Sequence, residues 1–303
     1  MSSQKKCARI IATCFKPKRV VEKTLLTGSP LGYYFHSQNF TTTEEIINLI
    51  KFNINLEKET NPGCEQDLII VNSDVGSKAG NEFINSLDGQ KIFNGEIKTI
   101  TRKNIGLCFG AYSDAFELLR DSYEYFIFTE DDLSITESLY AKRSIDIFES
   151  SNKIGFLAFV GKTTIARGHW KDVGITSKEM AFTCHGAVGL SSSKVLGEVY
   201  DLHGMLPHNK TDNYLDGITF GEVALPQSIL KFGYELHDQP KDLYLAVPSY
   251  DLMRGIEIIK FPTTKDKIIF KFKSLLYRIF TSFKVTERIY LIVLKAIKGK
   301  ETS

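Results

Sequence analysis

The stretch from Tyr125 to Asp132 constrains the fold more than any other part of this sequence, because four apolar residues are followed by Thr129 and then by three acids. Such an apolar run is typical of a strand buried in the core of a sheet. Side chains alternate along a strand, so Glu130 and Asp132 are expected on one face and Asp131 on the other. Two carboxylates on one face repel each other unless a positive charge neutralises them.

Two sources of positive charge fit this position. Mg²⁺ or Mn²⁺ binds oxygen ligands of this kind, often together with a phosphate group. Alternatively, the acids favour the positive end of a helix that starts near Ser138.

Short apolar runs alternate with amphipathic segments along the chain. Strands are expected at residues 7–15, 67–71, 96–101, 154–160 and 244–248, with a strand pair within 181–190. Helices are expected from a cap at 41–44 onward, and at 79–87, 112–121, 138–150, 193–202 and 222–232. This alternation predicts an α/β fold with a doubly wound, mostly parallel sheet flanked by helices.

Polar side chains follow several of these strands. Thr13 lies near the end of the first, Asp74 follows the second, and the acids follow the fourth. In a parallel sheet such ends gather at one edge, where open α/β sheets bind ligands. Asp74 alone is weak support, because Asn-Ser-Asp is also common turn chemistry.

The loop at 101–112 lies between two of these strand ends. Gly106 and Gly110 allow the backbone to approach a ligand closely, and Arg102 or Lys103 can pair with phosphate. An ordinary connection between a strand and a helix has the same composition.

The charge of the chain is unevenly distributed, although its net value is only +2. Residues 265–303 contain ten basic and three acidic residues, whereas the rest of the chain contains 28 basic and 33 acidic ones. The small net charge gives no reason to expect nucleic acid as a partner. The basic C-terminal segment instead favours a polyanionic surface.

Residues 263–303 combine aliphatic and aromatic side chains at helical spacing with lysines and arginines. This composition predicts an amphipathic helical tail that lies on an anionic membrane. A helix packed on its own domain or on a second subunit is the alternative, which leaves an oligomer possible.

Five cysteines without a CxxC pair favour reduced thiols and argue against a zinc module. The first residues lack the apolar core of a signal peptide, and the apolar run at 289–294 is too short to cross a bilayer. We therefore expect a cytoplasmic protein, peripherally associated with the cytoplasmic face of the membrane.

The order of these elements resembles the nucleotide-sugar half of GT-A-type glycosyltransferases. The segment Glu130–Leu133 resembles the EDD form of their DxD motif, and Arg102, Asn104 and Gly106 resemble the R-x-N-x-G segment of family 2-like members. The resemblance covers residues 7–240 in the order of elements, and its specific motifs lie within 67–133. The region of Asp74 lacks the D-G-S pattern that is usual in the family.

The resemblance implies a GT-A-like catalytic domain over residues 1–262, with a nucleotide-sugar half at 1–135 and an acceptor half at 136–262. Asp132 would bind Mn²⁺ or Mg²⁺, which bridges the diphosphate of the donor, and Glu130 would face the ribose or the sugar. The rest of the implied donor site is Arg102 on the diphosphate or base and Asp74 on the nucleoside, together with Thr13, Asn104, Gly106 and Asp131.

An inverting transfer also needs a general base beside the acceptor hydroxyl. The family often places this acid at the start of a helix in the second half, so Glu222 is the first candidate and Asp216 the second. Glu222 is also explained as a favourable charge at a helix N-terminus. A C-terminal histidine is sometimes a metal ligand in the family, and His237 is the candidate, although a lone histidine on a strand is more often structural.

The sequence thus predicts a metal-dependent glycosyltransferase. It would move a sugar from a nucleotide-sugar donor, with a UDP-sugar favoured, to a hydroxyl of a glycan or lipid-linked acceptor, with inversion, in surface-polysaccharide assembly. A nucleotidyltransferase on a similar sheet is one alternative, although the segment after the first strand, 14–19, contains no glycine. A non-catalytic scaffold recruited to the membrane is the other.

Overall fold

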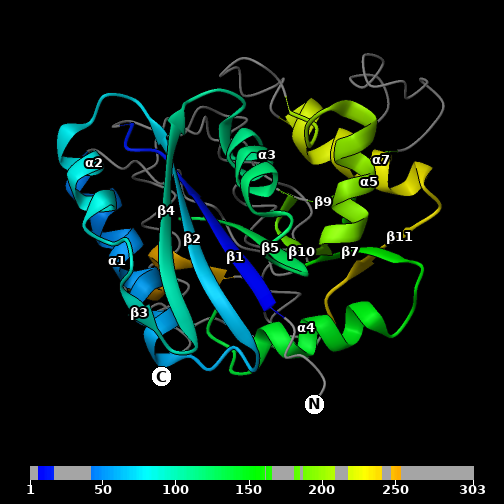
Figure 1. The fold of residues 1–303 in the computed structure, drawn as a ribbon, viewed down its shortest axis with the longest axis horizontal. Helices are drawn as coiled ribbons and strands as arrows, with labels where there is room; N and C mark the ends of the chain where they lie inside the picture. Colours follow the sequence, from blue (N-terminus) through cyan, green and yellow to red (C-terminus); the bar gives the residue numbers. More distant parts are fainter. Residues whose placement is uncertain are drawn as a thin grey trace, which may run out of the picture. The chain divides into compact units, whose positions relative to one another are not determined.

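The computed structural model describes residues 6–16, 42–160, 162–165, 181–184, 187–208, 218–240 and 247–253. They form an eight-stranded sheet in the order β11-β7-β10-β5-β1-β2-β4-β3, with helices on its faces (Figure 1). The four strands that run parallel at its centre are β1 (Lys6–Thr13), β2 (Glu65–Asp74), β4 (Gly95–Lys103) and β5 (Tyr125–Glu130). The predicted α/β fold with a mostly parallel sheet is confirmed.

The register of the parallel strands brings their carboxyl ends to one edge. Ala12 of β1 lies beside Glu130 of β5, and the next residue, Thr13, lies beside Asn72 of β2. Asp74 at the end of β2 pairs with Lys103 at the end of β4. The polar residues that follow separate strands in the sequence therefore face a common edge.

The second half of the chain completes the sheet with antiparallel pairs. β10 (Gly189–Ser192) lies between β5 and β7 (Ile154–Ala158) and is antiparallel to both, and β11 (Glu235–Asp238) is parallel to β7. At the other end, β3 (Lys91–Ile92) pairs with the start of β4. The predicted strand pair within 181–190 is wrong, because β9 (Ala181–Cys184) pairs with β8 (Lys162–Ile165) in a separate sheet. A long-range partner outcompetes the nearest one when it buries more apolar surface, and Leu190 of β10 is fully buried.

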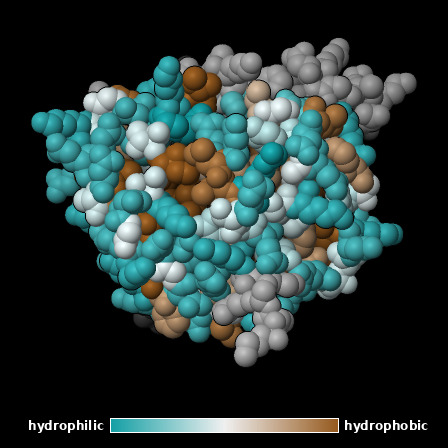
Figure 2. All heavy atoms as spheres, viewed as in Figure 1, coloured by the Kyte–Doolittle hydropathy of each residue, from teal (hydrophilic) through white to brown (hydrophobic). Residues whose placement is uncertain are grey.

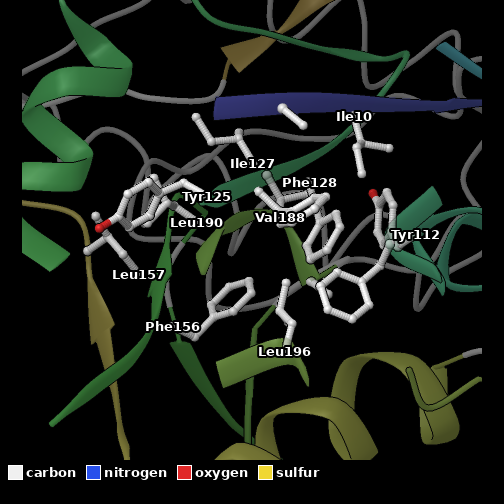
Figure 3. Close-up of a cluster of buried hydrophobic side chains, with 14 of the residues drawn as sticks. Ile10, Tyr112, Tyr125, Ile127, Phe128, Phe156, Leu157, Val188, Leu190 and Leu196 are labelled. Atoms are coloured by element: carbon white, nitrogen blue, oxygen red, sulfur yellow. The ribbon is translucent and has the colours of Figure 1, made fainter. Parts of the chain in front are cut away.

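Helices cover both faces of the central sheet because its apolar side chains alternate. Leu68 and Ile70 belong to a core with α1 (Thr43–Glu59) and α2 (Lys78–Asn85). Ile69 and Val71 belong to the larger core on the other side, which includes side chains of α3 (Leu107–Leu119), α4 (Tyr140–Glu149) and α5 (Ser193–His203). Figure 3 shows part of this larger core. This period-two pattern is what makes the central strands read as continuous apolar runs.

The helix boundaries follow from local chemistry. Thr42 caps α1, and the side chain of Glu45 accepts in return from the main-chain nitrogen of Thr42 at 3.1 Å. The remaining elements are the π-helical turn η3 (Ile218–Val223), α7 (Ala224–Lys231), β6 (Leu133–Ser134), β12 (Val247–Pro248) and α8 (Ser249–Met253). Pro226 lies in the first turn of α7, where a missing N–H group costs little.

The face shown in Figure 2 is mostly hydrophilic, with an apolar area near the middle of the view. Among the described residues, no helix is both long and apolar enough to cross a membrane. The predicted tail at 263–303 and Asp216 lie outside the part of the chain that the structure describes.

Candidate active site

The three consecutive acids after β5 have different surroundings. Asp131 is fully buried, and its Oδ2 atom accepts a hydrogen bond of 2.5 Å from Oγ1 of Thr13. Its main-chain nitrogen donates to the carbonyl oxygen of Ala12 at 3.2 Å. Thr13 is also buried, so this pair fastens the turn after β5 to the end of β1 and does not line an open surface.

Glu130 and Asp132 affect the pKa values of two side chains near the start of α3. Burial raises the pKa of the Cys108 thiol well above its usual value, and the charges of Glu130, Glu222 and Asp132 raise it further. Burial likewise raises the pKa of Tyr112, and Cys108, Glu130, Asp132 and Asp131 add to this effect. Glu130 and Asp132 therefore lie near both side chains, and Glu222 of η3 lies near Cys108.

A glycine in η3 allows this close approach. A Cβ atom at Gly221 would lie 2.1 Å from the ring of Phe109 in α3, so only glycine permits the contact. The next residue is Glu222, which sequence analysis selected as the first candidate for the base. The close approach of η3 to α3 thus explains how an acid from the second half of the chain comes close to those of the first.

The core beneath the acids is aromatic. The rings of Tyr112 and Phe128 are stacked with centroids 4.7 Å apart, and Figure 3 shows them side by side. The hydroxyl of Tyr112 is buried and has no hydrogen-bond partner among the described residues. A buried polar atom beside several carboxylates is unusual, because such groups are nearly always paired with protein or with water.

Arg102 holds the loop between β4 and α3 together. Its guanidinium pairs with Asp114, donates to Oγ of Ser73 at 3.2 Å and donates to the carbonyl oxygen of Ile105 at 2.8 Å. A Cβ atom at Gly110 would lie 2.0 Å from that same carbonyl oxygen. These contacts favour a structural role for Arg102 and Gly110, and a contact of Arg102 with a diphosphate stays a prediction.

The loop also forms an unusual helix start. Gly106 and Leu107 both have positive φ angles, 75° and 55°, which are strained for leucine. α3 begins at Leu107, five residues earlier than predicted. No side chain caps this end within the described part of the chain, and the first N–H groups of a helix have no acceptor within the helix. Asn104 is half-buried just before this turn.

A pocket of about 450 Å³ lies beside the loop between β4 and α3. Among the described residues it is lined by Arg102, Lys103, Ile105, Asp114 and His208, and not by the acids at the end of β5.

Asp74 lies at the end of β2 and is engaged locally. Its Oδ1 atom accepts from Nδ2 of Asn81 at 3.0 Å and from the nitrogen of Gly76 at 2.8 Å. These hydrogen bonds, that from Asn81 most of all, lower the pKa of Asp74. The arrangement is a turn of the kind that Asp favours, and a contact with a nucleoside stays a prediction.

His237 lies far from the acids. Its neighbours across the sheet are Leu157 on β7, then Leu190 on β10, then Ile127 on β5. Three inter-strand spacings amount to about 14 Å, and Asp132 comes five residues after Ile127. This separation is too large for two ligands of one metal ion, so the site proposed below does not include His237.

Sequence analysis missed the buried charges beneath the acidic turn. Arg9 on β1 is fully buried, pairs with Glu57 of α1, and donates to Oγ1 of Thr129 and to the carbonyl oxygen of Leu133, each at 3.4 Å. Burial opposes the charge of Arg9, but Glu57 and Tyr140 outweigh it, so the pKa of Arg9 is raised. Arg9 thus holds the chain immediately before and after the three acids. The sequence feature that indicates such a buried charge is an arginine inside an otherwise apolar strand.

The donor set suits a hard divalent cation. Glu130, Asp132 and Glu222 offer carboxylate oxygens, which Mg²⁺ and Mn²⁺ prefer. No three His, Cys, Asp or Glu of the described residues are grouped closely enough to enclose a metal ion by themselves. Mg²⁺ commonly takes only one or two carboxylates and completes its shell with substrate phosphates and water, so the residues present fit such an ion.

Comparison with solved structures finds similar chains at low identity. The chain is similar to the mannosyltransferase PcManGT from Pyrobaculum calidifontis in complex with GDP-Man and Mn²⁺, at 11% identity and a TM-score of 0.46, over 82% of this chain and 58% of that one. It is also similar to the galactosyltransferase LgtC in complex with donor and acceptor sugar analogues, at 10% identity and a TM-score of 0.36, over 76% and 72% of the two chains.

A third similar structure is a putative glucose-1-phosphate thymidylyltransferase from Bacillus anthracis in complex with a sucrose. Its identity is 9% and its TM-score 0.42, over 83% of this chain and 93% of that one. No protein-family model and no protein of curated function matches the sequence. At these identities the similarities concern the fold alone, and the function rests on the residues of the site.

Proposed function

We propose that this protein is a metal-dependent glycosyltransferase that moves a sugar from a nucleotide-sugar donor to an acceptor hydroxyl. The observation that carries the proposal is that Gly221 packs against Phe109, which brings η3 to the start of α3, where Glu130, Asp132 and Glu222 all affect Cys108. This position lies at the edge of the parallel sheet where ligands bind. The resemblance of Glu130–Leu133 to the EDD motif supports the same assignment.

On this proposal the donor site is made by Asp132, Glu130 and the start of α3. Asp132 would hold Mn²⁺ or Mg²⁺, and the bound ion would supply positive charge beside the diphosphate of the donor. Glu130 contacts the ribose or the sugar. The first N–H groups of α3 have no helical partner and bind phosphate oxygens, because the positive end of a helix favours anions.

The acceptor side is assigned to Glu222. Its carboxylate accepts the proton of the acceptor hydroxyl as that oxygen attacks the sugar, and attack from the face opposite the diphosphate inverts the anomeric carbon. Asp216 is the second candidate for this base. We further propose a UDP-sugar as donor, a glycan or lipid-linked acceptor, and a role in surface-polysaccharide assembly.

Calorimetry with UDP and Mn²⁺ tests the proposal. We expect wild-type protein to bind UDP in a Mn²⁺-dependent manner, and Asp132→Ala to weaken this binding by at least tenfold. Glu222→Gln should bind almost as well as wild type and lose roughly 10²- to 10⁴-fold in turnover, as expected for a missing general base. Asp146→Ala, which removes an exposed acid of α4, is the matched control.

The products separate the proposal from its alternatives. A glycosyltransferase commonly hydrolyses its donor slowly without acceptor, whereas a scaffold releases no sugar. Release of pyrophosphate from a nucleoside triphosphate and a sugar phosphate would instead identify a nucleotidyltransferase. Equal binding of UDP and Mn²⁺ by wild type and Asp132→Ala would remove the metal site.

A further inference from the structure

We propose that Asn53 and Ser249 are positioning residues that set the direction of the Asp132 carboxylate. Together with Ser134 they form a group of buried polar side chains, here called the carbonyl clamp. The clamp holds the main-chain carbonyl of Asp131, and the main-chain nitrogen of Ser249 holds that of Asp132. The inference rests on the proposed function, because it concerns the acid assigned to the metal.

Asn53 connects α1 to the acidic turn. It is fully buried, and its Nδ2 atom donates to the carbonyl oxygen of Asp131 at 2.8 Å. Its Oδ1 atom accepts from Oγ of Ser134 at 2.9 Å. The side chain of a helix residue that is 78 positions away in the sequence thus fixes a carbonyl in the middle of the acids.

Ser249 connects the end of the described chain to the same turn. It is fully buried, and its main-chain nitrogen donates to the carbonyl oxygen of Asp132 at 2.8 Å. Its Oγ atom lies 2.7 Å from Oγ of Ser134 and 3.4 Å from the carbonyl oxygen of Asp131. The pairing of β12 with β6, in which Val247 lies beside Ser134, brings Ser249 to this place.

These contacts matter because residues 131 and 132 lie between strands. β5 ends at Glu130 and β6 begins at Leu133, so the carbonyls of the two residues between them are outside both strands. Donors from α1 and α8 satisfy these carbonyls and restrict the backbone angles of both residues. The direction of the Asp132 side chain follows from those angles, so the clamp orients the carboxylate without touching its oxygens.

Ser249→Ala tests the clamp with little change in volume. It removes the hydroxyl contacts to Ser134, to Nδ2 of Asn53 and to the Asp131 carbonyl, and it leaves the main-chain bond to Asp132. We expect Mn²⁺-dependent UDP affinity to fall roughly 10- to 100-fold, as for other residues that orient metal ligands. Hydrogen exchange of the amides at 130–135 should be roughly fivefold faster. Asn53→Ala should have the same effects, and Ser249→Thr, which keeps the hydroxyl, should restore part of the affinity.

Ser191→Ala is the matched control. Ser191 is also fully buried, and its hydroxyl donates to the carbonyl oxygen of Gly155 at 2.6 Å, at the other end of β5. Ser191→Ala should lower thermal stability about as much as Ser249→Ala does. It should leave the Mn²⁺-dependent UDP affinity and the hydrogen-exchange rate of the acidic turn unchanged. Equal loss of affinity in Ser191→Ala and Ser249→Ala, or unchanged affinity in Ser249→Ala, would overturn the clamp.

The two proposals fail in distinguishable ways. If wild-type protein does not bind UDP with Mn²⁺, the proposed function fails, and hydrogen exchange decides on the clamp by itself. Unchanged exchange at 130–135 in Ser249→Ala then overturns the clamp, and faster exchange in Ser249→Ala but not in Ser191→Ala supports it.

Discussion

At the scale of single residues, burial divides the acids of this protein into different roles. Asp131 is fully buried against Thr13, whereas its neighbours Glu130 and Asp132 act on the start of α3. Three consecutive carboxylates therefore have two kinds of environment, one structural and one that faces the proposed ligand. A pattern of residue types does not distinguish them, because the alternation along a strand gives relative direction but not surroundings.

Asp67 at the start of β2 shows how a buried acid affects stability with pH. Burial raises its pKa, but hydrogen bonds from Tyr123 at 2.6 Å and Lys98 at 3.0 Å outweigh this, so the pKa of Asp67 is lowered overall. An acid with a lowered pKa stabilises the folded state above its unfolded pKa of about 3.9, and this contribution is lost as the pH falls through the folded value.

We predict that Asp67→Asn lowers the free energy of unfolding by about 1–3 kcal/mol at pH 7, the range for hydrogen bonds to a charged group. The difference from wild type should begin to shrink below about pH 4, because the carboxyl of the unfolded chain then binds a proton, and it should be lost once the pH falls below the lowered pKa of the folded carboxyl. Urea unfolding at several pH values measures this. Asp146→Asn, in an exposed pair with Lys142, should change stability by less than about 1 kcal/mol at any pH. A constant difference for Asp67→Asn across this range would contradict the charge-based explanation.

At the scale of elements, the start of α3 organises the site. The helix follows a turn with two positive φ angles and approaches Ile105 so closely that Gly110 has no room for a side chain. On its other side Phe109 touches Gly221 of η3, whose next residue is Glu222. One helix terminus therefore brings together the loop after β4, the acids after β5 and the base assigned in η3.

We predict that Gly110→Ala lowers the free energy of unfolding by about 1–3 kcal/mol, because the added methyl would lie 2.0 Å from the carbonyl oxygen of Ile105. Gly197→Ala is the matched control, since Gly197 lies within α5 and has no atom within 4 Å of an added Cβ. That substitution should raise stability by about 0.5–1 kcal/mol. Thermal unfolding of both variants measures the contrast. A Gly110→Ala variant as stable as wild type would show that the Ile105 carbonyl moves away from the methyl group without loss of stability, and it would contradict the prediction.

At the scale of the whole molecule, the charge distribution suggests a second surface besides the site. The basic excess of residues 265–303 supports our proposal that this segment attaches the protein to an anionic membrane. Attachment to a membrane would suit a lipid-linked acceptor, which is one of the two acceptors proposed above.

We predict that replacing Lys267, Lys271 and Arg278 together by Gln weakens binding to phosphatidylserine vesicles by about 3 kcal/mol, roughly 100-fold, because each basic residue near the surface contributes about 1 kcal/mol. Co-sedimentation measures this, and added salt should weaken wild-type binding as well. Replacing Lys78, Lys91 and Lys142, which are exposed on the body, should have little effect. Equal binding of wild-type protein to neutral vesicles would contradict the electrostatic attachment.

The sequence by itself determined the elements that depend on local periodicity and local chemistry. The apolar strand at 125–128, the cap of α1 near Thr42 and the parallel core follow from side-chain spacing within a few residues. The end of β5 was correctly expected at the edge where the carboxyl ends of the parallel strands gather, because parallel strands share their direction.

Only the tertiary structure decided the relations between distant segments. In the folded chain β9 and β10 belong to different sheets, and His237 lies three strand spacings from β5. The contact between Gly221 and Phe109 brings Glu222 close to Cys108, which Glu130 and Asp132 also affect. The physical reason is that strand pairing and close packing select among many partners by the surface they bury and the polar groups they satisfy. Neither quantity can be read from the spacing of residues along the chain.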